Sequence, residues 1–361
     1  MNVDIRGVNN ETALCLAAAG GHTDLLNLFL QHKADVNAQD EDGDTPLITA
    51  VINGKNAFVR ALLDQCGDKL NLDLRNKAGK TAIQIAFKAG NEEVVTLLAD
   101  KNARFDCDDE KQKKILFKCA VEGKAFFIKF WFRQHPGKQA VINMTRNSHT
   151  LSSVSALNGS LDVLEVLHQE GANLDIPDKD GDTPLFCAAQ NGFRKIVEFL
   201  LLLEHDRSLG KERNADGSTP ALLAAMKGKH EVLQVLAEND CLEANDVDND
   251  GSTILMMAIQ SGSVPTVRML LETGDCNTTA VNNNGIGVQT LATQCRDEAM
   301  LELLRQFGIE GQLAEAEATE AQQTSTGLDC GVGKPKRHKA RFAVDRILKD
   351  TTTNDQLTDE E

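Results

Sequence analysis

The chain has 361 residues, a net charge of −16 and a pI near 5.0. An acidic balance argues against nucleic-acid binding, which needs a basic surface. No apolar run reaches the roughly 18 residues that a membrane-spanning helix requires, so no membrane span is expected. The nine cysteines lack the spacing of a disulfide framework, which predicts reduced thiols and a cytoplasmic or nuclear location.

A period of 33 to 36 residues organises the chain. Nine copies can be aligned on one helix-capping position, occupied by Thr12, Thr45, Thr81, Lys114, Thr150, Thr183, Thr219, Thr253 and Gly287. A glycine follows nine residues later in eight of the copies, from Gly21 to Gly262. Self-similarity at such a period is typical of a stacked solenoid.

Residues 181–192 show how each copy begins. Thr183 is expected to cap a short helix with its hydroxyl, Pro184 suits the first helical position, and Gly192 ends the helix. A second helix with an apolar stripe follows the glycine, and an Asp or Asn such as Asp178 closes the turn before the cap. Helices this short are unstable alone and need the neighbouring copies.

The recurring pattern Asp-x-x-Gly-x-Thr-Pro-Leu, then Ala-Ala and Gly, is similar to the ankyrin repeat, most closely at residues 178–191 and 40–54. The resemblance covers about residues 5–310. It implies an all-α fold, an ankyrin-repeat α-solenoid of helix-turn-helix units with hairpin-like loops, stabilised by packing between neighbouring repeats. We expect an ankyrin-repeat array over 1–310 and a flexible acidic tail over 311–361.

Repeats four and five match the pattern least well. Lys114 replaces the capping threonine of repeat four, at a cost on the order of 1 kcal/mol. The second helix of that repeat is aromatic, and Phe126 stands where other copies carry Asp24 or Glu93. Phe126 therefore either belongs to an exposed apolar patch on the outer helical face or is covered by the long loop that follows.

No catalytic constellation is present in the sequence. We find no phosphate-binding loop, no HExxH and no paired CxxC, and the histidines lack metal-like spacing. We therefore predict no enzyme activity, no catalytic residue, no metal site and no cofactor.

In the ankyrin family, loop tips and the inner face of the first helices commonly bind proteins. The resemblance, together with the atypical repeats four and five, gives candidate protein-binding residues. These are Glu41, Asp42, Asp44, Lys77, Lys80, Lys88, Lys111, Lys113, Lys114, Phe126, Arg146, Asp180, Asp182, Gln190 and Asn191.

The predicted tips are acidic at both ends of the array and basic in the middle. The basic set is Lys77, Lys80, Lys111, Lys113, Lys114 and Arg146. It would steer a partner with an acidic or phosphorylated segment to the centre of the array. The alternative is a solvated surface of mixed charge without a specific partner.

The tail carries a basic run that is similar to a nuclear localisation signal. Its candidate import residues are Lys334, Lys336, Arg337, Lys339 and Arg341. The alternatives are a solvated charge run, or a segment that folds back onto the acidic array. The apolar residues that follow, from Phe342 to Leu348, could form a short helix that docks on a partner or on the last repeat.

We therefore expect a monomeric, non-catalytic protein–protein interaction module that acts as an adaptor, scaffold or inhibitor. One alternative is a regulatory or targeting subunit of a separate enzyme. Another is a secreted bacterial effector that binds host proteins inside a host cell.

Overall fold

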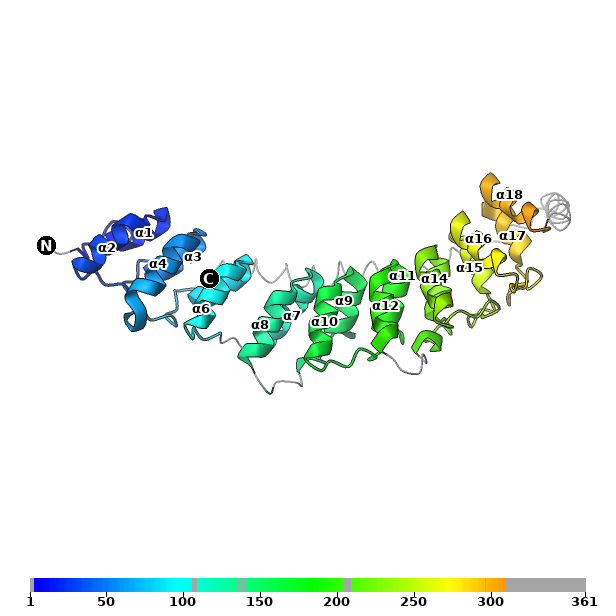
Figure 1. Cartoon of the computed structure of the whole chain (residues 1–361), viewed down its shortest axis with the longest axis horizontal. Helices are drawn as coiled ribbons and strands as arrows, with labels where there is room; N and C mark the ends of the chain where they lie inside the picture. Colours follow the sequence, from blue (N-terminus) through cyan, green and yellow to red (C-terminus); the bar gives the residue numbers. More distant parts are fainter. Residues whose placement is uncertain are drawn as a thin grey trace. The chain divides into compact units, whose positions relative to one another are not determined.

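The structure is a computed structural model, and it describes residues 3–105, 109–135, 137, 141–203, 209–295 and 297–309. The predicted tail and its candidate import residues lie outside these ranges. The described chain forms two compact units, residues 1–112 (unit 1) and 113–361 (unit 2), as far as each is described. Figure 1 shows paired helices following one another along each unit.

Each repeat contributes two helices, which confirms the predicted helical architecture. In repeats one to three they are α1 (Ala13–Gly20), α2 (Thr23–Gln31), α3 (Pro46–Ile52), α4 (Asn56–Cys66), α5 (Ala82–Ala89) and α6 (Glu92–Asp100). Repeats four to six contribute α7 (Asp109–Val121), α8 (Ala125–Gln134), α9 (Leu151–Asn158), α10 (Leu161–Gln169), α11 (Pro184–Asn191) and α12 (Arg194–Leu203). Repeats seven to nine contribute α13 (Pro220–Met226), α14 (His230–Glu238), α15 (Ile254–Gln260), α16 (Val264–Glu272), α17 (Val288–Cys295) and α18 (Glu298–Gln306). Short 3-10 turns follow α4 and α12, at η1 (Gly67–Lys69) and η3 (Leu209–Lys211).

The helices of each unit form two layers. First helices pack on first helices, as α1 does on α3 and α11 on α13, and second helices pack on second helices, as α12 does on α14. The core lies between the layers and is made of small and branched apolar side chains such as Ala188, Leu222 and Val232, all fully buried. Each repeat therefore completes its core only with its neighbours.

Most threonine caps form as predicted. The hydroxyl of Thr45 accepts a hydrogen bond from Ile48 N at 3.2 Å, and that of Thr150 accepts one from Ser153 N at 3.0 Å. Thr183 has N-cap backbone angles, but its buried hydroxyl makes no hydrogen bond, so the predicted cap is wrong at that copy. Gly192 ends α11 in the left-handed conformation, as predicted.

Repeat four departs from the expected turn. The sequence alignment predicts a helix that starts after Lys114, but α7 begins at Asp109, five residues before Lys114. Two residues before the cap, the other repeats need a positive φ, supplied for example by Gly43 (φ 76°) and Gly181 (φ 80°). Gln112 stands at that position in repeat four and favours a helix instead.

Repeat five has the clearest hairpin. Strands β1 (Thr145–Arg146) and β2 (His149–Thr150) are antiparallel, with Arg146 opposite His149. The two linking residues, Asn147 (φ 52°) and Ser148 (φ 71°), are both left-handed, as a tight two-residue turn requires. The hairpin-like loop implied by the resemblance is thus present, and it leads directly into α9.

The aromatic helix α8 is mainly core. Phe127, Phe130 and Trp131 are buried, whereas Phe126 is half-buried. The Phe126 ring packs against two rings of its own helix, at 5.2 Å from Phe127 and 6.4 Å from Phe130 between centroids. Both interpretations of Phe126 stay predictions, because much of the following loop lies outside the described residues.

Candidate functional site

Backbone hydrogen bonds join the turn tips of neighbouring repeats, and we call this series of bonds the tip ladder. Glu41 N donates to Asn9 O, and Lys77 N donates to Asp42 O, both at 2.8 Å. Bonds at the equivalent positions join the tips of repeats six to nine: Ala215 N donates to Asp180 O, Asn249 N to Asp216 O, and Asn283 N to Asp250 O. Side chains at these tips are therefore carried on a backbone that the neighbouring repeat fixes in place.

Two predicted binding residues take part in contacts between repeats. Asn76 Nδ2 donates to Asp44 Oδ1 at 2.9 Å, and Asn214 Nδ2 donates to Asp182 Oδ1 at 2.7 Å. Asp44 is half-buried and Asp182 only 9% exposed. Burial raises the pKa of the Asp44 carboxyl, opposed by the Asn76 bond and helped by the negative charges of Asp40 and Asp42. These two carboxylates therefore have a structural role between repeats, and their binding role stays a prediction.

The other candidate residues on turns and inner helices differ in accessibility. Those with exposed side chains are Glu41, Asp42, Lys77, Lys80, Lys88 and Asp180. Asn191 is half-buried and donates to Cys187 O at 2.8 Å, and Gln190 is 5% exposed.

The predicted basic centre is changed by the fold of repeat four. Lys111, Lys113 and Lys114 were expected near a turn tip, but all three lie within helix α7 because the turn is replaced by helix. Lys113 and Lys114 are half-buried. Arg146 lies on β1 and is also half-buried. Lys77 and Lys80 are the members of the predicted set that occupy an exposed turn.

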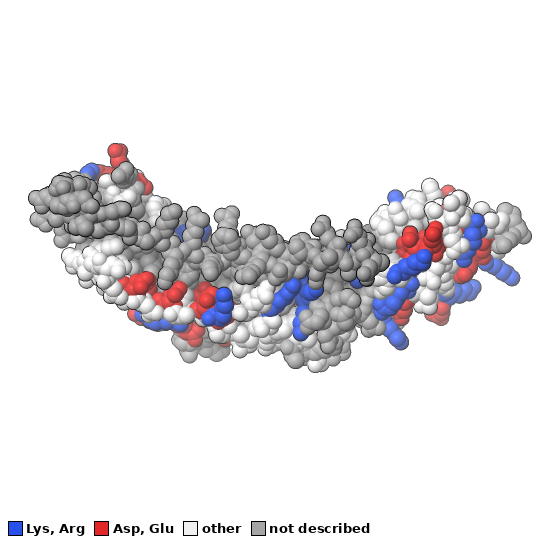
Figure 2. All heavy atoms as spheres, turned by 180° about the vertical axis from the view of Figure 1, so that it is seen from behind, with Lys and Arg blue, Asp and Glu red and all other residues white. Residues whose placement is uncertain are grey.

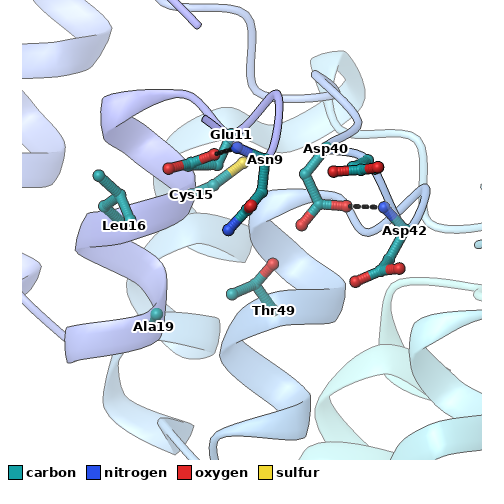
Figure 3. A pocket seen from close by; sticks show the side chains of 9 residues that line it. Asn9, Glu11, Cys15, Leu16, Ala19, Asp40, Asp42 and Thr49 are labelled. Atoms are coloured by element: carbon teal, nitrogen blue, oxygen red, sulfur yellow. Dashed lines mark hydrogen bonds between the residues drawn. The ribbon is translucent and has the colours of Figure 1, made fainter. Parts of the chain in front are cut away.

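Unit 1 has a hollow where the tips and first helices of repeats one and two meet (Figure 3). It is open to solvent, has a volume of about 430 Å³ and is lined by Asn9, Glu11, Cys15, Leu16, Ala19, Asp40, Glu41, Asp42 and Thr49. Two lining residues, Glu41 and Asp42, were predicted from the sequence.

The carboxylates of this hollow are partly used in shaping the turns. Glu11 Oε2 accepts from Asn9 N at 2.7 Å, and Asp40 Oδ1 accepts from Asp42 N at 3.0 Å. Leu16 adds an apolar wall and is 58% exposed. Sequence reasoning missed Leu16 because the equivalent positions of later repeats, such as Cys187 and Leu223, are buried. No local sequence signal distinguishes Leu16 from these buried counterparts.

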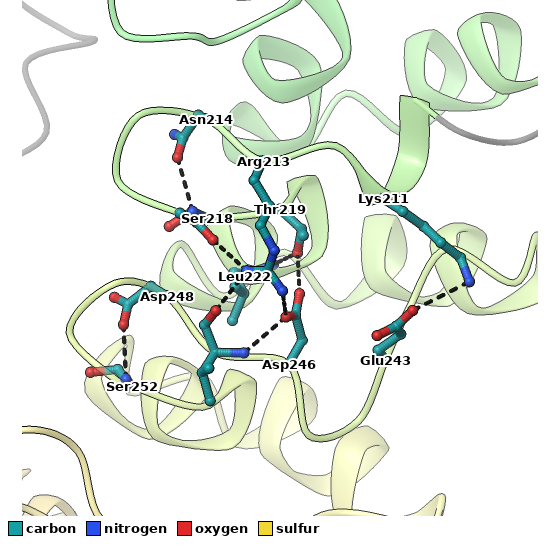
Figure 4. A network of polar contacts seen from close by, with 12 residues as sticks. Lys211, Arg213, Asn214, Ser218, Thr219, Leu222, Glu243, Asp246, Asp248 and Ser252 are labelled. Carbon is teal, nitrogen blue, oxygen red and sulfur yellow. Dashed lines mark hydrogen bonds and ion pairs between the residues drawn. The ribbon is translucent and has the colours of Figure 1, made fainter.

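A second polar cluster links repeats seven and eight (Figure 4). The buried Asp246 carboxylate pairs with Arg213 Nη2 and accepts from the Thr219 hydroxyl at 2.9 Å. Arg213 Nη1 also donates to Gly217 O at 2.6 Å and Val247 O at 2.7 Å. Both oxygens of the Asp246 carboxylate are bonded to residues of repeat seven, so the cluster serves as a joint between repeats.

Two features of the described residues concern metal binding and the reactivity of cysteines. Among them, no group of three His, Cys, Asp or Glu side chains could hold a metal ion. Burial raises the pKa of the Cys119 thiol to about 12 and that of Cys187 well above its ordinary value, so neither is a ready nucleophile. No helix in the described ranges is long and apolar enough to cross a membrane.

Comparison with protein families agrees with this geometry. Family models of ankyrin repeats match residues 1–73 and 201–282 (three-copy model) and residues 149–201 (many-copy model). The chain belongs to the ankyrin-repeat family. The stretch between the matched segments, residues 74–148, contains repeat four, in which α7 replaces the usual turn.

Similar proteins are of several kinds. The chain is 23% identical over 201 residues to a Caenorhabditis elegans transient receptor potential cation channel subfamily A member 1 homolog, covering 56% of this chain and 16% of the relative. It is 35% identical over 103 residues to the NF-kappa-B inhibitor cactus of Drosophila yakuba (28% and 21%). It is 44% identical over 75 residues to protein phosphatase 1 regulatory subunit 12A of Mus musculus (21% and 7%). The chain spans less than a quarter of the length of each of these relatives.

Proposed function

We propose that this chain is a non-catalytic protein-binding module that acts as an adaptor, scaffold or inhibitor. The observation that carries the proposal is the hollow of repeats one and two, which combines exposed carboxylates with the exposed Leu16 on a tip ladder fixed by hydrogen bonds. Convex apolar and basic side chains of a partner fit such a concave, acidic surface. Similarity to an NF-kappa-B inhibitor supports an inhibitory role.

In unit 1 the charge of the turn tips changes sign from one repeat to the next. Glu41 and Asp42 of repeat two lie beside Lys77 of repeat three, whose N–H donates to Asp42 O, and Lys80 follows in the same turn. The partner segment would therefore place a basic and an apolar residue in the hollow and an acidic or phosphorylated residue near Lys77 and Lys80. Charge order of this kind selects the partner and its direction.

A second candidate function is that of a regulatory or targeting subunit of a separate enzyme. The similarity to a protein phosphatase 1 regulatory subunit over 75 residues favours it. In both cases the chain binds protein through the same surface. The candidates differ in whether an active enzyme is bound.

Binding of proteins from an extract of the source cells tests the proposal. The unsubstituted full chain is compared with the double variant Glu41→Lys/Asp42→Lys, which reverses two charges of the hollow. The bound proteins are measured by affinity purification and quantitative mass spectrometry. Asp24→Lys/Asp100→Lys, on the exposed second helices of unit 1, is a control with the same charge change. We expect one set of partners to be lost with the first variant and kept with the control. Equal retention by both variants would refute the proposed surface, and a retained phosphatase or kinase activity would favour the second function.

A further inference from the structure

Repeats five and six are linked by a pair of side chains that includes an imidazole. In repeat six, Asp182 precedes the capping threonine and accepts a hydrogen bond from Asn214 of repeat seven at 2.7 Å. The same Asp–Asn pair links repeats two and three. At the equivalent positions of repeats five and six stand His149 and Asp178, with 3.5 Å between Nδ1 and Oδ2. Imidazole is the side chain whose charge ordinarily changes between about pH 5 and pH 8, so this link can respond to pH.

Both members of this pair are buried. The side chain of His149 is 10% exposed and that of Asp178 is 5% exposed. His149 Nδ1 is a buried atom without a hydrogen-bond partner among the described residues. An imidazolium formed here would therefore lose its hydration without gaining a hydrogen bond from Nδ1, which makes the charged form costly.

The hairpin of repeat five adds a second positive group next to this imidazole. Arg146 on β1 lies opposite His149 on β2, and Nη1 of its guanidinium is likewise buried without a hydrogen-bond partner among the described residues. Like charges on directly opposite residues destabilise a strand pair. Helix α9, which packs on β2, carries no charged side chain. The repeat that holds His149 thus offers no negative group that would favour its protonation.

The charged groups that face His149 from repeat six are Asp178, Lys179 and Asp180. Burial lowers the pKa of His149, the two carboxylates oppose this effect, Lys179 adds to it, and the net direction is downward. The contacts and the charges therefore agree that the folded junction favours the neutral imidazole.

Asp178 connects this pair to the tip of repeat six. Its Oδ1 accepts hydrogen bonds from Asp180 N at 2.9 Å and from Asp182 N at 3.0 Å. Asp182 in turn accepts the bond from Asn214 of repeat seven, and Asp180 O belongs to the tip ladder. A change at His149 therefore reaches the tip of repeat six and the next junction through bonded groups.

The row of tips that begins at this junction is acidic. Asp180, Asp216 and Asp250 occupy the same tip position in repeats six, seven and eight, and all three are exposed. Figure 2 shows Asp and Glu side chains recurring along the C-terminal part of unit 2, at the left of that view. A basic segment of a partner would be attracted to such a row.

We infer that protonation of His149 loosens the junction between repeats five and six, so that mild acid releases the turn that carries Asp180. Because folding lowers the pKa of His149 from 6.5, the stability of the neutral form is fully present above pH 6.5. It is lost as the pH falls from 6.5 through the lowered pKa. A basic segment bound to the tips of repeats six to eight would be released under the same conditions. The inference concerns unit 2 and does not depend on the proposed hollow in unit 1.

Hydrogen–deuterium exchange of the full chain at about pH 5 and about pH 7.5 tests the inference. The comparison variant is His149→Asp/Asp178→Asn, which gives this junction the Asp–Asn pair found between repeats six and seven. After correction for the intrinsic effect of pH on exchange, acid should lower the protection of α9 and α11 at least about threefold more in the unsubstituted chain than in this variant. His168→Asn, at an exposed histidine of α10, is the control and should behave as the unsubstituted chain. Equal losses of protection in the unsubstituted chain and the double variant, or a gain in acid, would overturn the inference.

An NMR titration of the unsubstituted chain gives a second readout in case the double variant does not fold. The ring signal of His149 is assigned through its own backbone amide and followed with the amides of Asp180 and Asp182. We expect a midpoint below 6.5 for the ring and the same midpoint for the two amides. A midpoint above 6.5 would mean that the charge of Asp178 outweighs burial and that acid tightens the junction, which would overturn the inference. Amides that do not follow the ring would overturn it as well.

Discussion

Asn214 Nδ2 lies 2.7 Å from Asp182 Oδ1, so an amide of repeat seven is bonded to a carboxylate of repeat six. Both side chains are buried. The same pair recurs between Asn76 and Asp44 in unit 1. The residue just before the capping threonine therefore links neighbouring repeats as well as belonging to the tip that a partner would meet.

Substitutions at Asp182 separate these two roles. Asp182→Ala should reduce the free energy of unfolding by about 1–3 kcal/mol, because it leaves the buried Asn214 amide without its acceptor. Asp182→Asn keeps an oxygen acceptor and should cost less than about 1 kcal/mol. Urea unfolding measures both. Equal losses would show that the charge, rather than the hydrogen bond, stabilises this junction.

Asp44 predicts a pH dependence of stability. Its pKa is raised from 3.8 in the folded state, mainly by burial. The folded state therefore holds the proton more tightly, and this group's contribution to stability falls as the pH rises from 3.8 through the raised pKa. The Asp44→Asn protein should be more stable than the unsubstituted chain at pH 7. Its free energy of unfolding should also lack the decrease with rising pH that Asp44 causes.

Urea midpoints between pH 3.5 and 7 measure the effect of Asp44→Asn. Asp100→Asn, on the exposed end of α6, is the matched control for the same chemical change at another site. An Asp44→Asn protein that is less stable at pH 7 would contradict the assignment of burial as the dominant cause.

Two turn glycines of unit 1 differ in the space around them. A Cβ on Gly43 would lie 2.9 Å from Lys77 N, the donor of the tip ladder, whereas a Cβ on Gly79 would meet nothing within 4 Å. Both have positive φ, so alanine at either costs about 1–2 kcal/mol of backbone strain. Gly43→Ala should lose more stability than Gly79→Ala by thermal or urea unfolding. The reverse order would mean that the ladder at Lys77 is not tightly held.

The Asp246 cluster predicts a strong effect on stability away from any tip surface. Asp246→Ala leaves Arg213 and the Thr219 hydroxyl without their shared acceptor and should cost about 2–3 kcal/mol, below the range for a fully buried pair because Arg213 is partly exposed. Asp250→Ala, an exposed tip residue of the same repeat, should change stability by less than about 0.5 kcal/mol. Similar losses for the two would show that the junction is not held by this cluster.

The repetitive part of the fold was predictable from the sequence. The period, the capping threonines and the helix-ending glycines are local features, and Thr45 and Gly192 behave as their residue types require. Repeat four was misjudged because the alignment was anchored on Lys114. The informative residue was Gln112, which cannot easily supply the positive φ of the turn and so extends α7.

The candidate site was predictable only in part. Glu41 and Asp42 line the hollow, since tip positions follow directly from the repeat register. The bond from Asn214 to Asp182 depends on a contact between residues far apart in sequence, which periodicity alone does not contain. The exposure of Leu16 likewise has no counterpart in the repeat pattern.

The central claim is that the hollow of repeats one and two binds a protein partner. Its most direct test is the affinity of the full chain for the partner recovered by affinity purification, measured for Leu16→Glu and for the control Leu202→Glu. Leu202 is 80% exposed on α12, so the control changes the same residue type outside the hollow. We predict that Leu16→Glu weakens binding at least about tenfold, as expected for a buried apolar anchor, and that Leu202→Glu leaves it unchanged. Equal affinity for both variants and the unsubstituted chain would contradict the account.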